Sequence, residues 1–158
     1  MRHADVECYT NRMLTPGSTA PMWKGNDQAG KERSSVEFSG TWLLLYFYPK
    51  DDTPGCTQEA CGLRDSYAEV SPRITVVGVS ADDEESHRKF AEKYRLPFTL
   101  IADTDRSIIT AFGADGVTFP KRVTFLIDPE NLIRKVYHGF DCAAHAEDVR
   151  KDLSEFGA

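Results

Sequence analysis

The sequence predicts an α/β fold in which helices cover a mixed central β-sheet. The continuously apolar segment Trp42–Tyr48 and the largely apolar segment Ile74–Ser80 are typical of strands that are buried on both faces. A helix is expected after each of them, over Pro54–Glu69 and Asp83–Tyr94, and this alternation favours parallel strands joined by crossover helices. A hairpin near the C-terminus adds antiparallel strands, which makes the predicted sheet mixed.

Shorter signals define the other elements. The turn-forming segment Asn26–Gly30 predicts an N-terminal β-hairpin. Residues 1–15 show no periodicity, and we expect them to form a flexible N-terminal extension of a single domain at 16–158. The remaining predicted elements are a strand at Thr99–Ala102, a short helix at Arg106–Phe112, hairpin strands at Val123–Ile127 and Leu132–Tyr137, and a final helix from about Ala143 to Phe156.

Size and charge restrict the class of protein. The 158 residues suit one domain, and 19 Lys and Arg residues against 25 Asp and Glu residues give a net charge of −6. This acidic balance argues against a nucleic acid or an anionic membrane as partner. The longest apolar run, Trp42–Tyr48, is far shorter than the roughly 20 residues that cross a bilayer. The N-terminus lacks the apolar core of a signal peptide, so we expect a cytoplasmic location.

The segment from Pro49 to Cys61 has the clearest chemical potential. It joins a buried strand to a helix, and ligands bind at this position in open α/β sheets. Thr53 is a preferred N-cap and Pro54 suits the first helical position, so Cys56 is expected in the first turn. Unpaired amides and the positive end of the helix dipole stabilise a thiolate there. We therefore expect Cys56 to be a reactive thiolate rather than a small buried hydrophobe.

The same geometry suits attack on a peroxide. The amides of Gly55 and Cys56 could donate to the peroxide oxygens as negative charge develops on the leaving oxygen. The Thr53 hydroxyl could accept from one oxygen and donate to the thiolate. Pro49 has no N–H and a rigid ring, so it could form a wall of the pocket and exclude water from the sulfur.

The second cysteine of the segment, Cys61, lies five residues after Cys56. On an intact helix this spacing separates the two Cα atoms by roughly 8–9 Å. A disulfide requires at most about 7 Å. Either Cys61 is inert, or the first turns of the helix must unwind after Cys56 is oxidised. Gly55 and Gly62 flank the pair, and each weakens the helix by about 1 kcal/mol relative to alanine.

These residues also resemble those of a known family. The pattern Pro49-x-x-x-Thr53-x-x-Cys56 resembles the active-site motif of peroxiredoxins. The wider segments Phe47–Lys50, Thr53–Thr57 and Glu59–Cys61 are similar to the peroxiredoxin Q branch, also called bacterioferritin comigratory protein. The likeness spans about residues 16 to 156. Supporting matches are Leu63–Asp65, Val77–Ser80, Arg122–Asp128 and Gly139.

The resemblance implies a thioredoxin-like fold and the reduction of hydrogen peroxide and organic hydroperoxides, with no cofactor or metal. Cys56 would be the peroxidatic cysteine and pass through a sulfenic acid, and Cys61 would be the resolving cysteine. Thioredoxin or a similar dithiol protein would reduce the resulting disulfide. Arg122, which composition alone would place at a surface strand start, matches the arginine that faces the thiolate and helps to bind the peroxide. A monomer is favoured, with a dimer as the alternative.

One segment departs from the pattern of the family. Gly113–Lys121, just before Arg122, is shorter than in many relatives and lacks their usual tryptophan. The preferred peroxide therefore stays open at this point.

Two other functions compete with the peroxidase hypothesis. A zinc site could use Cys56, Cys61, Cys142 and His145 if both pairs converged in space. A thioredoxin-type dithiol oxidoreductase would require Cys-x-x-Cys, whereas this chain has Cys-x4-Cys. The other candidate side chains have no partner pattern, so we expect a free thiol at Cys8 and surface positions for His3, His87 and His138.

Overall fold

The computed structural model describes residues 14–70, 74–138, 142 and 144–157. In these residues a seven-stranded sheet has the order β2-β1-β5-β4-β3-β6-β7. The elements in chain order are β1 (Lys24–Asp27), β2 (Glu32–Ser34), the 3₁₀ helix η2 (Ser35–Phe38), β3 (Trp42–Phe47), α1 (Pro54–Val70), β4 (Ile74–Ser80), α2 (Glu84–Tyr94), β5 (Thr99–Ala102), α3 (Ser107–Ala111), β6 (Val123–Ile127), β7 (Ile133–His138) and α4 (His145–Glu155).

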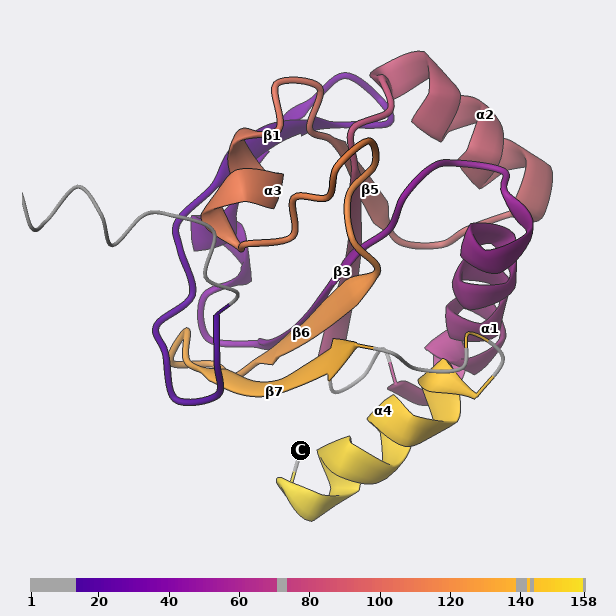
Figure 1. Cartoon of the computed structure of the whole chain (residues 1–158). Helices are drawn as coiled ribbons and strands as arrows, with labels where there is room; N and C mark the ends of the chain where they lie inside the picture. Colours follow the sequence, from indigo (N-terminus) through magenta and orange to yellow (C-terminus); the bar gives the residue numbers. More distant parts are fainter. Residues whose placement is uncertain (1–13, 71–73, 139–141, 143, 158) are drawn as a thin grey trace, which may run out of the picture.

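The sheet is mixed, as the sequence predicts. Strands β3, β4 and β5 are parallel, whereas β6 is antiparallel to β3 and β1 is antiparallel to β5. The N-terminal hairpin is the pair β1–β2, and the C-terminal hairpin is the pair β6–β7. Helices α1, α2 and α4 cover one face of the sheet and α3 lies on the other (Figure 1).

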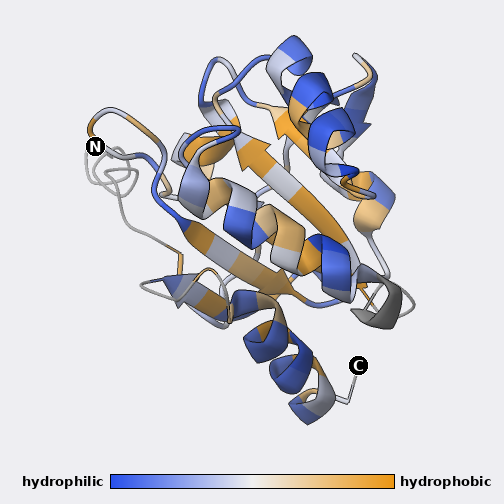
Figure 2. Ribbon diagram, turned by 90° about the vertical axis from the view of Figure 1, so that its right-hand side faces the viewer, coloured by the Kyte–Doolittle hydropathy of each residue, from blue (hydrophilic) through white to orange (hydrophobic). Residues whose placement is uncertain are grey.

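Alternate residues of β3 divide the hydrophobic core into two parts. Leu44 and Tyr46 join the cluster beneath α1, α2 and α4, together with Cys56 of α1. Leu43, Leu45 and Phe47 point to the opposite face and pack with residues of α3. Figure 2 shows this arrangement as apolar strands at the centre and helices of mixed polarity outside. Every residue of β3 after Trp42 is buried, which agrees with the continuous apolar run in the sequence.

Helix boundaries agree with the predictions to within two residues. Helix α2 begins after Asp83, whose carboxylate accepts the Ser86 amide, and it ends at Arg95 in the left-handed conformation. In α4 the side chains of Ala146, Val149 and Leu153 are buried, and Phe156 packs beside them. The short helix η2 has no counterpart among the elements predicted from the sequence. Across the described ranges, no helix combines the length and apolar character needed to cross a bilayer.

Candidate active site

The sheet register places the two central residues of the site side by side. Phe47, the last residue of β3, pairs with Val123, the first residue of the antiparallel strand β6. The chain before β6 therefore lies beside the chain that leads from β3 into α1. As a result Arg122 Nη2 lies 3.1 Å from Cys56 Sγ, although the two residues are 66 positions apart. Cys56 is only 1% exposed.

The first turn of α1 leaves amide donors beside the sulfur. The Thr57 amide donates to the Thr53 carbonyl at 2.8 Å and so makes the first hydrogen bond of the helix. The amides of Gly55 and Cys56 have no acceptor among the described residues. This is the position at which a helix binds an anion, because free N–H groups and the helix dipole act together.

The predicted role of the Thr53 side chain is wrong in one respect. Its hydroxyl donates to the Lys50 carbonyl at 2.9 Å, not to the Cys56 sulfur. This bond closes the turn at Lys50–Thr53 and uses the only hydroxyl proton. The lone pairs of the hydroxyl oxygen remain able to accept a hydrogen bond. Pro49, which precedes this turn, is half-buried.

Gly55 allows the arginine to approach the helix. A Cβ atom at this position would lie 3.0 Å from Arg122 Nη2 and 3.6 Å from its Cζ. A contact of 3.0 Å is tighter than nine in ten Cβ contacts in proteins, so a side chain here would press on the guanidinium. A side chain at Gly55 would therefore make the guanidinium beside Cys56 shift by a few tenths of an ångström.

Glu59 is a site residue that was not among those predicted from the sequence. Its Oε2 accepts from Arg122 Nη1 at 3.4 Å, and its side chain is completely buried. Its Oε1 has no hydrogen-bond partner among the described residues. The signal was present in the sequence, because Glu59 lies three residues after Cys56 and so faces the same side of the helix.

Burial and charge act against each other at these groups. Burial raises the pKa of Glu59 to about 7, although Arg122 partly lowers it. Burial also lowers the pKa of Arg122, but the charges of Cys56 and Glu59 outweigh that effect and raise it. The Tyr46 hydroxyl is buried nearby, and its pKa lies well above the ordinary value because of burial and of the charge on Glu59. The arginine is thus shared between one sulfur and one carboxyl group.

Cys61 faces away from the group formed by Cys56, Glu59 and Arg122. It lines an open groove of about 530 Å³ beside α1, together with Asp52, Thr57 and Tyr94, whereas Cys56 does not line it. Helix α1 is continuous across both positions, and Cys56 and Cys61 are both free thiols. The structure therefore represents the wound helix in which the two cysteines lie on different sides.

The structure does not bring the four candidate zinc ligands together. His145 Nε2 is 2.9 Å from the Thr124 hydroxyl, and burial together with Arg122 lowers the pKa of this histidine to about 4. Within the described ranges, the only three-residue group with metal-ligating atoms close together is Asp51, Asp82 and His87. The prediction of a surface position for His87 is wrong, because this side chain is fully buried. His138 is exposed, as expected, and His3 and Cys8 lie outside the described residues.

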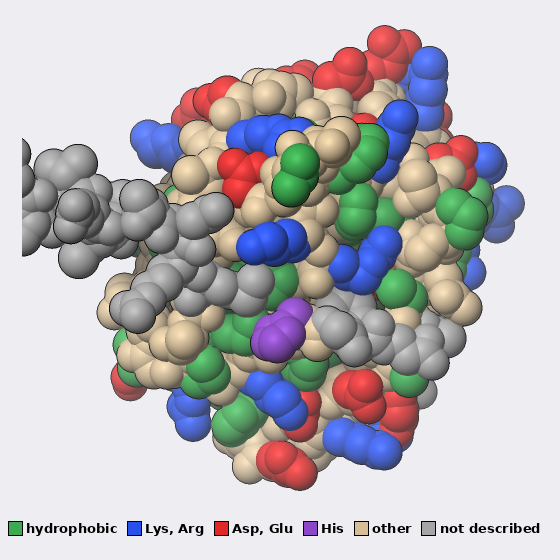
Figure 3. Space-filling view, viewed as in Figure 1, with side chains coloured by type: hydrophobic (Ala, Val, Ile, Leu, Met, Phe, Trp, Pro, Cys, Tyr) green, Lys and Arg blue, Asp and Glu red, His purple; other side chains and the backbone are tan. Residues whose placement is uncertain are grey.

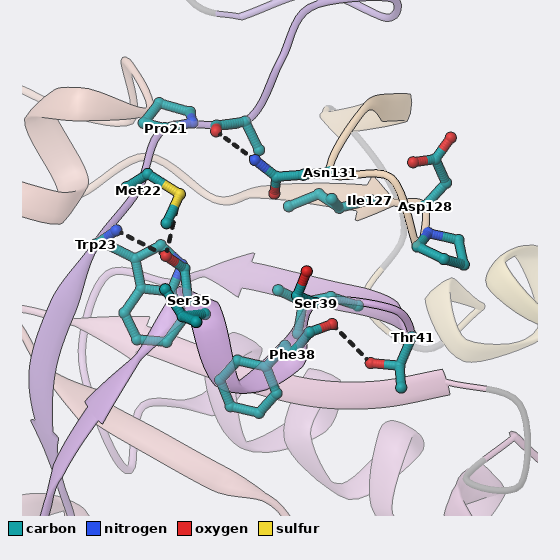
Figure 4. Close-up of a pocket in the computed structure, with 14 residues that line it drawn as sticks. Pro21, Met22, Trp23, Ser35, Phe38, Ser39, Thr41, Ile127, Asp128 and Asn131 are labelled. Atoms are coloured by element: carbon teal, nitrogen blue, oxygen red, sulfur yellow. Dashed lines mark hydrogen bonds between the residues drawn. The ribbon is translucent and has the colours of Figure 1, made fainter.

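The apolar cavity in Figure 4 belongs to another part of the molecule. It has a volume of about 200 Å³ and is lined by residues that include Trp23, Phe38, Leu43 and Asp128. Leu43 and Ile127 lie at the ends of β3 and β6 that are opposite to Cys56 and Arg122. On the face in Figure 3, acidic and basic side chains are interspersed rather than gathered by sign.

Comparisons with known proteins agree with the geometry. A sequence model described as the AhpC/TSA family matches residues 16–136. The chloroplastic peroxiredoxin Q of Sedum lineare is 39% identical over 145 residues, which are 89% of this chain and 78% of that protein. The crystal structure of peroxidoxin BcpB from Mycobacterium tuberculosis has a TM-score of 0.84 and 34% identity, and covers 91% of this chain and 98% of that one.

A third relative has been studied for its alkyl peroxide reduction activity. It is the bacterioferritin comigratory protein of Xanthomonas campestris, with a TM-score of 0.82 and 28% identity over 92% of this chain and 98% of that one. The fold and the site define a thiol-dependent peroxidase with a thioredoxin-like fold. The chain belongs to the AhpC/TSA family and, within it, to the peroxiredoxins of the Q type.

Proposed function

We propose that Cys56 is the peroxidatic cysteine and that Arg122 holds it as a thiolate. The observation that carries this proposal is the 3.1 Å contact between Arg122 Nη2 and Cys56 Sγ at the start of α1. The free amides of Gly55 and Cys56 add two donors on the same turn. A permanent cation and unpaired amides favour a negative sulfur and a negative leaving oxygen in the same way.

The first half-reaction needs no cofactor. The Cys56 thiolate attacks the terminal oxygen of ROOH, an S–O bond forms and the O–O bond breaks. The electron pair of the O–O bond leaves on RO⁻, which takes a proton to become the alcohol, or water when R is hydrogen. The sulfur is oxidised to a sulfenic acid. Arg122 and the Gly55 and Cys56 amides stabilise the charge that moves onto the leaving oxygen.

Thr53 and Pro49 orient the peroxide in this proposal. The Thr53 hydroxyl donates to the Lys50 carbonyl, so its oxygen is left to accept the peroxide O–H. Pro49 stands at the end of β3 without an N–H that could compete for the substrate. Together with Gly55 and Arg122 these residues form the binding site for the peroxide.

Cys61 resolves the sulfenic acid after α1 opens. Its thiolate attacks Cys56 Sγ, the S–S bond forms and the S–O bond breaks, and hydroxide leaves and takes a proton to become water. The wound helix keeps the two Cα atoms roughly 8–9 Å apart, beyond the reach of a disulfide. The first turns must therefore unwind locally in each cycle.

The reductant is a dithiol protein of the thioredoxin type. It restores both thiols by thiol–disulfide exchange, and the groove beside Cys61 gives it access to this cysteine rather than to the buried Cys56. We propose a cytoplasmic monomer that protects against oxidants there. We also propose that its substrates include organic hydroperoxides besides hydrogen peroxide, in line with the alkyl peroxide activity of the Xanthomonas campestris relative.

Peroxide turnover in three proteins tests the mechanism. Wild type, Cys56→Ser and Cys61→Ser are each given hydrogen peroxide or an alkyl hydroperoxide with thioredoxin and its reductase. We expect Cys56→Ser to be inactive, and Cys61→Ser to consume about one equivalent and then stall. Full activity of Cys56→Ser would overturn the assignment. Sustained turnover of Cys61→Ser would show that a different thiol resolves the sulfenic acid.

A further inference from the structure

A buried polar network connects helix α2 to the loop that leads into α1. His87, in the first turns of α2, has no solvent exposure. Its Nδ1 lies 2.7 Å from Asp51 Oδ2, and its Nε2 lies 2.9 Å from the Ile101 carbonyl. A carbonyl only accepts, so Nε2 carries a proton, and a second proton lies between Nδ1 and the carboxylate. The ring therefore joins the loop to the sheet by two hydrogen bonds.

Asp51 is held from several elements at once. Its Oδ1 accepts the Tyr48 hydroxyl at 2.6 Å, and its Oδ2 also accepts the Ser86 hydroxyl at 2.8 Å. Its amide donates to Asp82 Oδ2 at 2.8 Å. Asp51 stands only two residues before Thr53, so these bonds fix the chain just upstream of the substrate site.

The cluster of Asp51, Asp82 and His87 is better explained by hydrogen bonding than by a metal. Their ligating atoms lie within 4.8 Å of one another. However, both nitrogens of His87 and both carboxylate oxygens of Asp51 already have partners. Asp82 Oδ2 accepts from the Asp51 amide and from the Ser80 hydroxyl. A cation would have to displace most of these bonds.

The next residue, Asp52, is attached to α2 by weaker contacts. Asp52 adopts φ 56°, in the left-handed region. Its carboxylate accepts from Lys93 Nζ at 2.7 Å and from the Tyr94 hydroxyl at 2.6 Å, and both ends of the ion pair are exposed. Exposed pairs contribute little, whereas a buried hydrogen-bonded charge is costly to disturb. The Asp51–His87 contact is therefore the stronger of the two attachments.

We propose that His87 is a positioning residue for the peroxidase reaction and that it acts through Asp51. The Asp51–His87 contact holds the loop before α1 in place. When the disulfide forms, the first turns of α1 unwind while this loop stays where it is. In the wound state the same contact keeps the Lys50–Thr53 turn aligned with Cys56. Loss of the contact should slow attack on peroxide and also ease the opening of α1. This inference rests on the proposed function of Cys56 and Cys61.

Two variants of His87 separate positioning from simple packing. The amide nitrogen of asparagine can take the place of Nδ1 and keep the bond to Asp51, whereas that of glutamine can take the place of Nε2 and keep the bond to Ile101. We expect His87→Gln to lower the second-order rate of Cys56 oxidation about tenfold, because it loses a hydrogen bond to a charged group. The same variant should form the Cys56–Cys61 disulfide faster. His87→Asn should stay close to wild type in both rates.

Rapid quenching with mass spectrometry gives both rates. Hydrogen exchange of the Asp51 amide, which donates to Asp82, and of the Thr57 amide, which donates to the Thr53 carbonyl, reports opening without any chemistry. Asp128→Asn is the matched control, because it alters a buried aspartate at the opposite end of the sheet. Equal effects of the two His87 variants on rates and exchange, or no effect of either, would overturn the proposal, as would a stoichiometric bound metal. If wild type fails to react with peroxide while the difference in hydrogen exchange between the variants persists, the proposed function is wrong. The role of the Asp51–His87 contact in holding the loop is then still supported.

Discussion

The two ends of the central sheet each contain a buried aspartate, and the two are held in different ways. Asp128, after β6, accepts the amides of Glu130 and Leu132 and pairs with Arg134, all within six residues. Asp51, after β3, depends on α2 and on the loop before it. The first arrangement is a self-contained turn. The second forms only when the whole domain is folded.

The two ends also differ in unsatisfied polar groups. At the Cys56 end, Glu59 Oε1 and the Tyr46 hydroxyl are buried without a partner among the described residues. Gly78 lies opposite Tyr46 in the sheet, and a Cβ there would clash with the tyrosine ring, so the ring is tightly enclosed. The Asp128 end instead borders an apolar cavity. These unsatisfied polar groups thus lie at the end of the sheet that holds Cys56 and Arg122, as expected of functional sites.

Arginine substitutions should give the largest contrast between the two ends. Arg122→Met removes the cation beside Cys56 and leaves Glu59 buried without its partner. We expect the second-order rate with peroxide to fall about 10²- to 10³-fold, the usual effect of losing one electrostatic donor. Arg134→Met removes a cation at the other end and should leave this rate unchanged. Stopped-flow measurement under single-turnover conditions compares them, and similar rates for both variants would contradict the role of Arg122.

Glu59→Gln tests how much the buried carboxyl group of Glu59 lowers the stability of the protein at the Cys56 end. The folded-state pKa of Glu59 is raised to about 7, above the ordinary value of 4.5. The contribution of Glu59 to the unfolding free energy is therefore fully present below pH 4.5. It is lost as the pH rises through 7, because the buried carboxyl group then ionises. Relative to wild type, the glutamine variant should gain up to about 3 kcal/mol in unfolding free energy between pH 4.5 and 8. Urea unfolding across this range measures the difference, and parallel curves would refute it.

Local signals were sufficient for the strands, for the α-helices and for the position of Cys56. The apolar run of β3 and the Thr53-Pro54 start of α1 are encoded within a few residues, and the structure has both. The Cys56–Arg122 contact depends on the register between β3 and β6, which no local pattern encodes. The resemblance to peroxiredoxins, not spacing, pointed to Arg122.

The buried network was missed for a related reason. His87 lies among charged residues of an amphipathic helix, so its neighbours in sequence indicate a surface position. Its partner Asp51 is 36 residues away, and only the folded sheet brings the two together. The hydroxyl of Thr53 shows a smaller error of the same kind, because a turn carbonyl competes with the sulfur for its proton.

Gly55→Ala adds a single methyl group at the Cys56 end of the sheet. The new Cβ would lie 3.0 Å from Arg122 Nη2, so the guanidinium must shift by a few tenths of an ångström from its position beside Cys56. We expect oxidation of Cys56 to slow about tenfold, because small displacements of catalytic groups have large effects on rate. The variant should nevertheless unfold at the same or a higher urea concentration, since alanine favours helix by about 1 kcal/mol. A loss of stability with normal peroxide reactivity would contradict this explanation.

Gly62→Ala changes the same helix beyond the cysteines and should have the smallest effect. Its new Cβ would meet only the Cys142 carbonyl at 3.9 Å, an ordinary contact. Arg122 and Cys56 are not disturbed, so attack on peroxide should proceed at the wild-type rate. Alanine makes the wound helix about 1 kcal/mol more stable, so formation of the Cys56–Cys61 disulfide should slow by up to about fivefold. Quenched-flow mass spectrometry separates the two steps. An unchanged disulfide rate would mean that α1 does not unwind as far as Gly62 during the cycle.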